Sequence, residues 1–358
     1  MEKKIYIIIA SVFSAIVLIA LLFLGWYKIE QKAPNLNNSD TIIEIKSGES
    51  TVEIVKELKS KKIIRSEFAT KIFIKLHEIN SLKAGKYSFS GKDDLTQVLE
   101  KLINGNVMDE TIKITFKEGK NMRSVVSEIA DKTSHSANDV YKVLENEAYI
   151  SSLIDKYWFL NESIKNKNIY YPLEGYLYPD TYIFENKNVK IETIFEAMLD
   201  QMSKVLSKYK TQIETSKYSV HDILTIASIV ELEGNNSSNR ANIAQVIYNR
   251  LSSNMSLGSD VTTYYAFKID MGTRNLYTKE INTANPYNTR GPDMAGKLPV
   301  GPIDNPSEDS IQAVLNPTQG KYLYFVADKN GEIYFTENYE EHQNTINTLK
   351  RKGLWYEY

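Results

Sequence analysis

The sequence predicts an α+β protein with an N-terminal transmembrane helix, one or two small β/α modules after it, and a larger mixed α+β domain over the rest of the chain. Three observations predict this arrangement. An uncharged apolar run occupies residues 5–27, strand-like and helical segments alternate over 41–150, and tyrosine and turn residues become frequent beyond 150. With 358 residues, the chain is long enough for two or three domains.

The apolar run at the N-terminus is long enough to cross a membrane. No charge interrupts residues 5–27, and as a helix they would span roughly 34 Å, more than the hydrocarbon core of a bilayer. A signal peptide has a shorter apolar core, and here Trp26 and Tyr27 lie at interface depth. We therefore expect a single-pass anchor at 5–27, a cytoplasmic tail at 1–4 and a polar linker at 28–40. A buried core helix is the alternative.

The orientation of this anchor depends on the short tail rather than on charge. Lysines lie on both sides of the run, at Lys3 and Lys4 before it and at Lys28 and Lys32 after it. A short N-terminal tail favours a cytoplasmic N-terminus. The rest of the chain is then expected outside the cytoplasm, held at the cell membrane.

Residues 41–110 show the pattern of a small β/α module. Alternating residues at 41–47 turn at Gly48, and apolar residues then recur at helical spacing over 52–58. A second helical segment, a short strand and an amphipathic helix over 93–104 follow. Acids in the first turn and Gly105 after the end mark the limits of that last helix.

The opening of this module recurs. Residues 43–58 match residues 114–129, and aligning Gly48 with Gly119 also pairs apolar positions along the strand and the helix. Short units of this kind resemble the LysM type of glycan-binding module, although a plain packing module is an equal alternative. The second copy forms part of a β/α unit at 111–150 that leads into the domain at 151–358.

The domain at 151–358 contains several expected elements in order. A long helix is predicted at roughly 190–216, and a mostly apolar helix ends at Gly234. The next helix begins after Ser237 or Ser238, which are good N-cap residues. Two aromatic-rich runs around Asn330-Gly331 predict a hairpin, and a helix carrying His342 follows.

Composition excludes several classes of function. A net charge of −2 provides no broad positive field, so nucleic acid is not an expected partner. The absence of cysteine excludes disulfides, thiolate catalysis and cysteine metal sites. The four histidines are scattered, which indicates surface or hydrogen-bonded residues rather than metal ligands. No metal or cofactor site is therefore expected, and the sequence lacks the common nucleotide, serine-hydrolase and zinc signatures.

The carboxylates at the end of the apolar helix are the remaining catalytic candidates. Glu231 follows Ala227 and Leu224 at i−4 and i−7, so partial desolvation should raise its pKa, as a general acid needs. Glu233 lies about 200° further round the helix, so only one of the two can face a given cleft. The alternative is that both glutamates cap the helix end or pair with Arg240 or Arg250.

Polar and aromatic residues follow these glutamates. Asn249 and Arg250 end the next helix, and Asp260 precedes two tyrosines. Aromatic rings beside carboxylates and amides are typical of sugar-binding grooves, and they also occur on ordinary protein surfaces.

Six sequence blocks occur together in a family-like order. They are ASIVELEG, IYNRL, MSLGSD, NPYNTR, LPVGPIDNPSEDSIQAVLNP and YLYFVAD, with EGYLYPDTY upstream and the apolar run first. In these blocks the chain resembles the YceG-like family of endolytic murein transglycosylases. The resemblance covers nearly the whole chain, is strongest over 170–345 and is weak over 41–110.

This resemblance implies a membrane-anchored lyase that cuts nascent peptidoglycan strands internally, with peptidoglycan and the elongation-machinery penicillin-binding proteins as partners. It implies that Glu231 is the catalytic acid. Substrate-binding positions that it implies are Glu233, Asn249, Arg250, Asp260, Tyr287, Asn288 and Thr289. The chain departs from the family pattern at Gly258 and Val261, where Gln and Pro are more usual, so a contact from the Gln position is expected to be missing.

Three functions remain open from the sequence. A transglycosylase needs one carboxylate, because the C6 hydroxyl of the N-acetylmuramic acid attacks its own C1 and leaves a 1,6-anhydro end, without the second carboxylate of a hydrolytic glycosidase. A muramidase would hydrolyse the same bond to N-acetylglucosamine, with Asp260 as the second carboxylate. A non-catalytic wall-binding scaffold would depend on the modules at 41–130.

Overall fold

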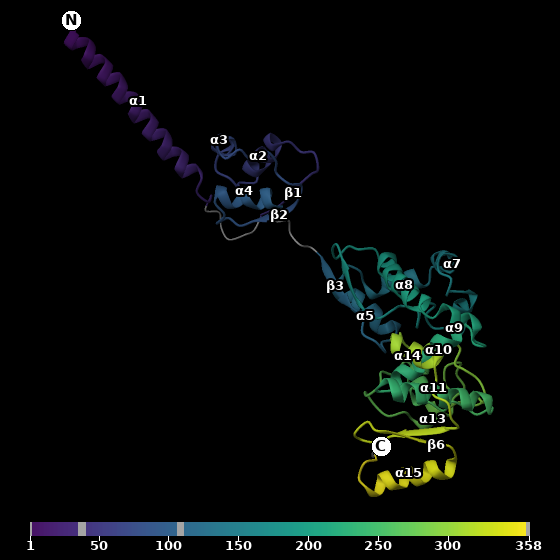
Figure 1. The fold of residues 1–358 in the computed structure, drawn as a ribbon. Helices are drawn as coiled ribbons and strands as arrows, with labels where there is room; N and C mark the ends of the chain where they lie inside the picture. The colour runs from purple at the N-terminus through teal and green to yellow at the C-terminus, as the bar shows by residue number, and fades with distance from the viewer. Residues whose placement is uncertain (1, 35–40, 106–110, 356–358) are drawn as a thin grey trace. The chain divides into compact units, whose positions relative to one another are not determined.

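The computed structural model describes residues 2–34, 41–105 and 111–355, with side chains from residue 11 onward (Figure 1). The chain divides into two compact units, Met1–Glu110 and Thr111–Tyr358. Both helices and short antiparallel strand pairs occur in it, so the α+β class is confirmed.

The first unit begins with the apolar helix α1 (Glu2–Glu30). Its segment Ser11–Glu30 is long and apolar enough to cross a membrane, and none of that segment is buried by protein. Large apolar side chains such as Phe13 and Leu22 are about two-thirds exposed, at 66% and 65%. The predicted N-terminal apolar helix is therefore confirmed, and its exposed side chains are compatible with lipid surroundings.

A small α+β module forms the rest of the first unit. Its elements are β1 (Thr41–Ile45), α2 (Thr51–Ser60), α3 (Glu67–Leu76), β2 (Gly85–Phe89) and α4 (Leu95–Asn104). The strands β1 and β2 pair antiparallel, with Ile43 opposite Tyr87. Capping boxes start α2 at Ser50 and α4 at Asp94, and Gly105 in a left-handed conformation ends α4.

The repeated sequence segment forms the same local unit in each part of the chain. The second copy consists of β3 (Ile112–Thr115) and α5 (Met122–Lys132). Gly48 and Gly119 both have positive φ, at +86° and +67°, which suits the tight turn from strand to helix. As β1 pairs with the next strand β2, so β3 pairs antiparallel with the next strand, β4 (Thr181–Phe184). The likeness to LysM modules stays a prediction.

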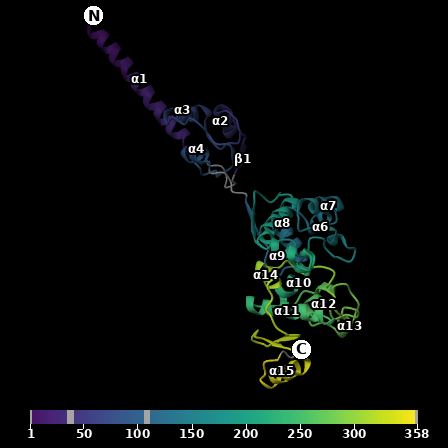
Figure 2. The ribbon, with the colours of Figure 1, turned by 45° about the vertical axis from the view of Figure 1, so that its right-hand side comes forward.

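The second unit is mainly helical (Figure 2). Its remaining elements are α6 (Ala137–Leu144), α7 (Glu147–Lys156), η1 (Glu162–Lys165), α8 (Ile191–Ser207), α9 (Lys210–Thr215), α10 (Val220–Glu233), α11 (Ser237–Ser252), α12 (Asp260–Ala266), α13 (Thr278–Ile281), α14 (Glu308–Leu315), β5 (Tyr324–Ala327), β6 (Ile333–Thr336) and α15 (Tyr339–Arg351). The helix predicted at roughly 190–216 is two helices, because the chain turns at Lys208 and Tyr209.

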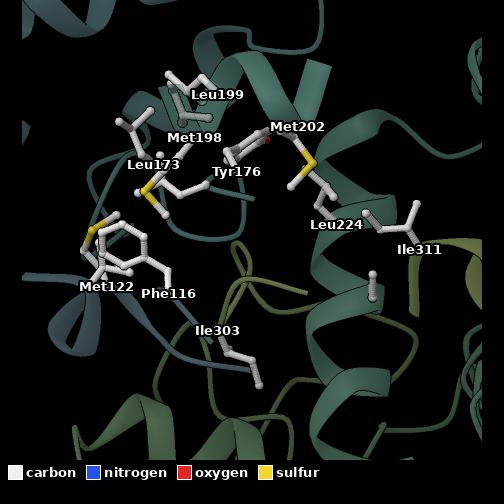
Figure 3. Packing of buried hydrophobic residues seen from close by; sticks show 14 of the residues in the cluster. Phe116, Met122, Leu173, Tyr176, Met198, Leu199, Met202, Leu224, Ile303 and Ile311 are labelled. Atoms are coloured by element: carbon white, nitrogen blue, oxygen red, sulfur yellow. The ribbon is translucent and has the colours of Figure 1, made fainter. Parts of the chain in front are cut away.

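Helix α10 lies at the centre of this unit and packs against α11, α12 and α14. Its residues are buried almost without interruption from His221 to Val230. Figure 3 shows Leu224 among Tyr176, Met202 and Ile311, which come from three other segments. The prediction of a helix covered on most sides is confirmed. A helix of this kind holds the residues at its end rigidly.

The C-terminal part forms the predicted hairpin and helix. Strands β5 and β6 pair antiparallel, and Gly331 in the turn has a φ of +81°. Helix α15 packs against both strands. This part lies in the same unit as α10, so the hairpin and α15 can contribute to a site at the end of α10.

Candidate active site

The two glutamates at the end of α10 point to different surroundings. The helix begins with a capping box at Ser219 and ends at Glu233, followed by Gly234. A Cβ atom on Gly234 would lie 2.6 Å from Cγ of Arg240 and 3.1 Å from the carbonyl oxygen of Val230. Glycine therefore permits α11 to approach the end of α10 closely. That approach brings Arg240 beside Glu231.

The carboxylate of Glu231 is surrounded by donors from the protein. Arg240 donates to Oε1 at 2.9 Å, and the Ser307 backbone N–H donates to Oε2 at 2.9 Å. The hydroxyls of Ser307 and Ser310 also donate to Oε2. The side chain is only 6% exposed. These contacts fix both oxygens of Glu231 beside the N-terminus of α14.

Glu233 lines a cavity of about 540 Å³ instead. Two groups of residues line it together with Leu257 and Gly258. The group we call the polar wall comprises Glu233, Arg250, Ser259, Asp260 and Arg290. The group we call the C-terminal wall comprises Phe325, Val326, Ala327, Ile333, His342, Ile346 and Trp355. Glu231 is not among the lining residues.

The surroundings of Glu233 favour its protonated form. Burial has the largest effect and raises the pKa of this carboxyl, whereas the Ser259 hydroxyl, which donates to Oε1 at 2.6 Å, lowers it. The neighbouring carboxylate of Asp260 raises the pKa, and the cations Arg290 and Arg250 lower it, so that the pKa remains raised. A carboxyl that keeps its proton closer to neutral pH, beside a cavity, can act as a general acid.

A short loop holds Ser259 against Glu233. The Gly258 and Ser259 backbone N–H groups donate to the carbonyl and to the hydroxyl oxygen of Thr289. Gly258 has a φ of +60°, and a Cβ there would lie 3.3 Å from a terminal nitrogen of Arg250. Glycine at this departure from the family pattern therefore leaves space for the Arg250 guanidinium.

Arg250 connects the two walls of the cavity. Its Nε donates to the carbonyl of Leu323 at 2.6 Å, and one terminal nitrogen donates to the carbonyl of Leu257 at 2.6 Å. Its guanidinium also lies 5.2 Å from the ring centre of Tyr324 on β5. On the other side, Asp260 at the start of α12 forms an ion pair with Arg290.

Four predicted substrate-binding residues are not among those that line the cavity. Tyr287, Asn288 and Thr289 are fully buried at 0% exposure. The Asn288 amide donates to three backbone carbonyls, and the Asn249 amide donates to those of Gly320 and Tyr322. Direct contact of these side chains with a sugar has no support in this geometry. Asn249 and Thr289 hold the segments that carry the lining residues of β5 and of the Gly258 loop.

Sequence reasoning missed several lining residues. Ser259 and Arg290 lie inside the quoted blocks MSLGSD and NPYNTR, so the blocks contained the signal. His342 was expected to be a surface or hydrogen-bonded residue, yet its Nδ1 is buried and has no partner. No local pattern indicates the C-terminal wall, because the hairpin and α15 come from a distant segment. Among the described residues, no three His, Asp or Glu side chains are grouped to hold a metal ion.

Comparisons with known proteins agree with this architecture. The model of the YceG-like family matches residues 43–348. A Bacillus subtilis protein named endolytic murein transglycosylase is 36% identical over 301 residues, covering 84% of this chain and 82% of that protein. A Streptococcus pneumoniae D39 protein of the same name is 31% identical, and the match covers 94% of this chain but only 64% of that longer protein. The 2.6 Å crystal structure of a yceG-like protein, lmo1499 from Listeria monocytogenes, is 32% identical and covers 86% of this chain and 100% of that chain, with a TM-score of 0.62.

Proposed function

The chain belongs to the YceG-like family, and from this membership we propose that it is an endolytic murein transglycosylase whose general acid is Glu233. Homology with relatives of that name supports an enzyme of the lyase type that acts on peptidoglycan. The observation that carries the residue assignment is the position of Glu233 in the cavity, with a pKa raised by burial and by Asp260.

Glu233 replaces Glu231 in this assignment. The resemblance in the sequence implied Glu231, but four protein donors already occupy its two oxygens. Glu231 does not line the cavity either, so neither of its oxygens is placed to reach a glycosidic oxygen there. We assign Glu231 the role of joining α10, α11 and α14 at the back of the site.

The proposed reaction uses Glu233 twice. Its protonated carboxyl donates to the glycosidic oxygen as the bond between C1 of N-acetylmuramic acid and N-acetylglucosamine breaks. The resulting carboxylate then accepts the proton of the C6 hydroxyl on the same muramic sugar, as that oxygen bonds to C1. The products are a free 4-hydroxyl on N-acetylglucosamine and a 1,6-anhydro-muramic end. Because ring closure is intramolecular, much of the entropic cost of assembling reactants is avoided.

A hydrolytic muramidase is the second candidate. Asp260 lines the same cavity and is 51% exposed in its side chain, so it could activate water. Its ion pair with Arg290 argues against this role, because the guanidinium already occupies one oxygen of this carboxylate.

The test is the chemistry of the new strand ends. Purified glycan strands digested in ¹⁸O-labelled water should yield 1,6-anhydro ends without label, at internal positions as well as termini. Mass analysis distinguishes these ends from hydrolytic ends by one water. Labelled, reducing muramic ends as the main product would establish the muramidase and exclude the transglycosylase.

We also propose that α1 anchors the enzyme in the cell membrane, with a cytoplasmic N-terminus. The exposed apolar surface of α1 supports this. In protoplasts, added protease should then degrade the chain beyond the anchor, and protection of that part would contradict the orientation. Glycan binding by the module at 41–110, and penicillin-binding proteins as partners, are proposals that rest on resemblance alone.

A further inference from the structure

His342 differs from the other three histidines of the chain in its hydrogen bonding. His77 and His135 each have one ring nitrogen on a backbone carbonyl, at 2.9 and 2.7 Å. His221 has both nitrogens engaged, by the Tyr176 hydroxyl and the Val300 carbonyl, each at 2.8 Å. The His342 ring has no such contact within the described part of the chain, and its Nδ1 is buried without a partner. A buried polar atom without a partner calls for an explanation.

The ring of His342 is held in place at the cavity that Glu233 also lines. It stacks on Tyr324, with ring centres 5.3 Å apart and an angle of 27° between the planes. The Arg250 guanidinium contacts the same tyrosine. The imidazole is therefore oriented by packing, as a residue that recognises a ligand needs to be.

The chemistry around His342 fits one part of an N-acetylated sugar. Its neighbours on the C-terminal wall are apolar: Phe325, Val326, Ala327, Ile333, Ile346 and Trp355. Burial and then the charge of Arg250 lower the pKa of His342, so the ring is neutral near pH 7 and offers one donor and one acceptor. An acetamido group combines an apolar methyl with an amide, and one ring nitrogen can pair with either the N–H or the carbonyl oxygen of that amide.

We propose that His342 is a substrate-contacting residue whose imidazole hydrogen-bonds the acetamido group of an N-acetylated sugar, while the C-terminal wall covers the methyl. This inference rests on the proposed function for the identity of the glycan. It adds a selectivity to that function: the enzyme distinguishes N-acetylated strands from de-N-acetylated strands through its C-terminal hairpin and helix.

The test compares binding of two short glycan strands, one N-acetylated and one chemically de-N-acetylated, to the full chain in detergent. Binding is measured by tryptophan fluorescence in a Glu233→Gln background, so that the strands are not consumed. His342→Phe keeps an aromatic ring against Tyr324 and removes both nitrogens. It should weaken binding of the N-acetylated strand about tenfold, which corresponds to about 1.4 kcal/mol, and leave the other strand unchanged.

Two further variants separate recognition from structure. His342→Asn keeps a donor and an acceptor and should recover part of the lost affinity. His135→Phe, the same substitution at a histidine that does not line the cavity, should leave both affinities unchanged. In the active enzyme, His342→Phe should raise KM for N-acetylated strands with kcat within about twofold of the parent, a split that a merely structural defect would not produce.

Equal binding of the two strands by the parent chain would overturn the proposal, and so would an equal loss for both strands in His342→Phe. If His342→Phe does not fold, the parent and His342→Asn decide the question through the ratio of the two affinities. An inactive parent chain that still discriminates between the strands through His342 would refute the proposed transglycosylase while supporting this inference.

Discussion

The surroundings of Glu231 and Glu233 differ completely, although the two residues are separated by a single leucine. Glu231 faces α11 and α14, where an arginine and two serines supply hydrogen bonds to both oxygens. Glu233 faces a cavity, where one serine donates to it and another carboxylate lies nearby. Positions two residues apart lie about 200° apart around a helix axis. The side chains of Glu231 and Glu233 therefore enter unrelated environments.

This comparison shows that burial alone does not identify a catalytic acid. Both oxygens of the buried Glu231 are bound by protein donors, which leaves none for a substrate. Glu233 is buried as well, but it lines a cavity, and desolvation raises its pKa. The distinction depends on the partners supplied by distant segments, such as α14 and the Gly258–Ser259 loop.

The largest expected difference between the two glutamates is in activity. Glu233→Gln should lower kcat by about 10³-fold or more, because the amide keeps the shape and removes the proton that the reaction needs. Glu231→Gln should retain measurable cleavage at a temperature where the variant is folded. Turnover of purified glycan strands measures both variants. Near-normal turnover by Glu233→Gln, with a dead Glu231→Gln that melts normally, would reverse our assignment.

The second difference is in stability, and its direction is opposite. Glu231→Gln removes the charge that pairs with the largely buried Arg240, which then keeps its ion pair with Asp309. We expect a loss of about 3 kcal/mol in the free energy of unfolding, and a fall of about 10 °C in Tm. Glu233→Gln should leave Tm within a few degrees. Thermal melts of the full chain in detergent provide the comparison, and equal melts for the two variants would contradict it.

The smallest expected effect is a shift in the pH dependence of kcat/KM. Because Glu233 has to be protonated, activity should fall on the alkaline side as the pH rises through its raised pKa. Asp260→Asn removes a carboxylate that raises this pKa and leaves Arg290 unpaired, so the alkaline limb should move to lower pH. Arg290→Gln removes a cation that lowers the pKa, so the limb should move to higher pH.

The two shifts serve as controls for each other, since Arg250 and Ser259 remain in both variants. Parallel shifts in one direction would indicate a disturbed cavity rather than a change in the pKa of Glu233. If the alkaline limb of kcat/KM stays at the same pH in both variants, another group supplies the proton.

Most of the local structure could be predicted because it depends on neighbouring residues. The apolar N-terminal helix, the amphipathic α4 with Gly105 after it, and the Asn330-Gly331 hairpin follow from periodicity and turn chemistry. Both copies of the repeated segment formed a strand, a glycine turn and a helix. The break at Lys208 and Tyr209 was missed because no glycine or proline marks it.

The candidate site could be predicted only in part. The quoted blocks located the end of α10, Arg250 and Asp260, and all three contribute to the region of the cavity. Tyr287, Asn288 and Thr289 lie in the same blocks, but their side chains are buried. The sequence of a block does not tell which of its residues line a cavity and which are buried beside it. His342 was expected to be a surface or hydrogen-bonded residue, because the residues next to an isolated histidine do not show which distant side chains will surround it.

The sequence by itself determined where the helices and turns form, that an apolar helix ends in two glutamates, and which family the chain resembles. Only the tertiary structure decided which glutamate meets donors and which meets a cavity, and that the C-terminal hairpin and α15 line the site. The physical reason is that periodicity and turn propensity act between residues close in the chain. Hydrogen-bond partners, desolvation and charge neighbours are supplied by segments tens of residues away, and these set the pKa values on which the chemistry depends.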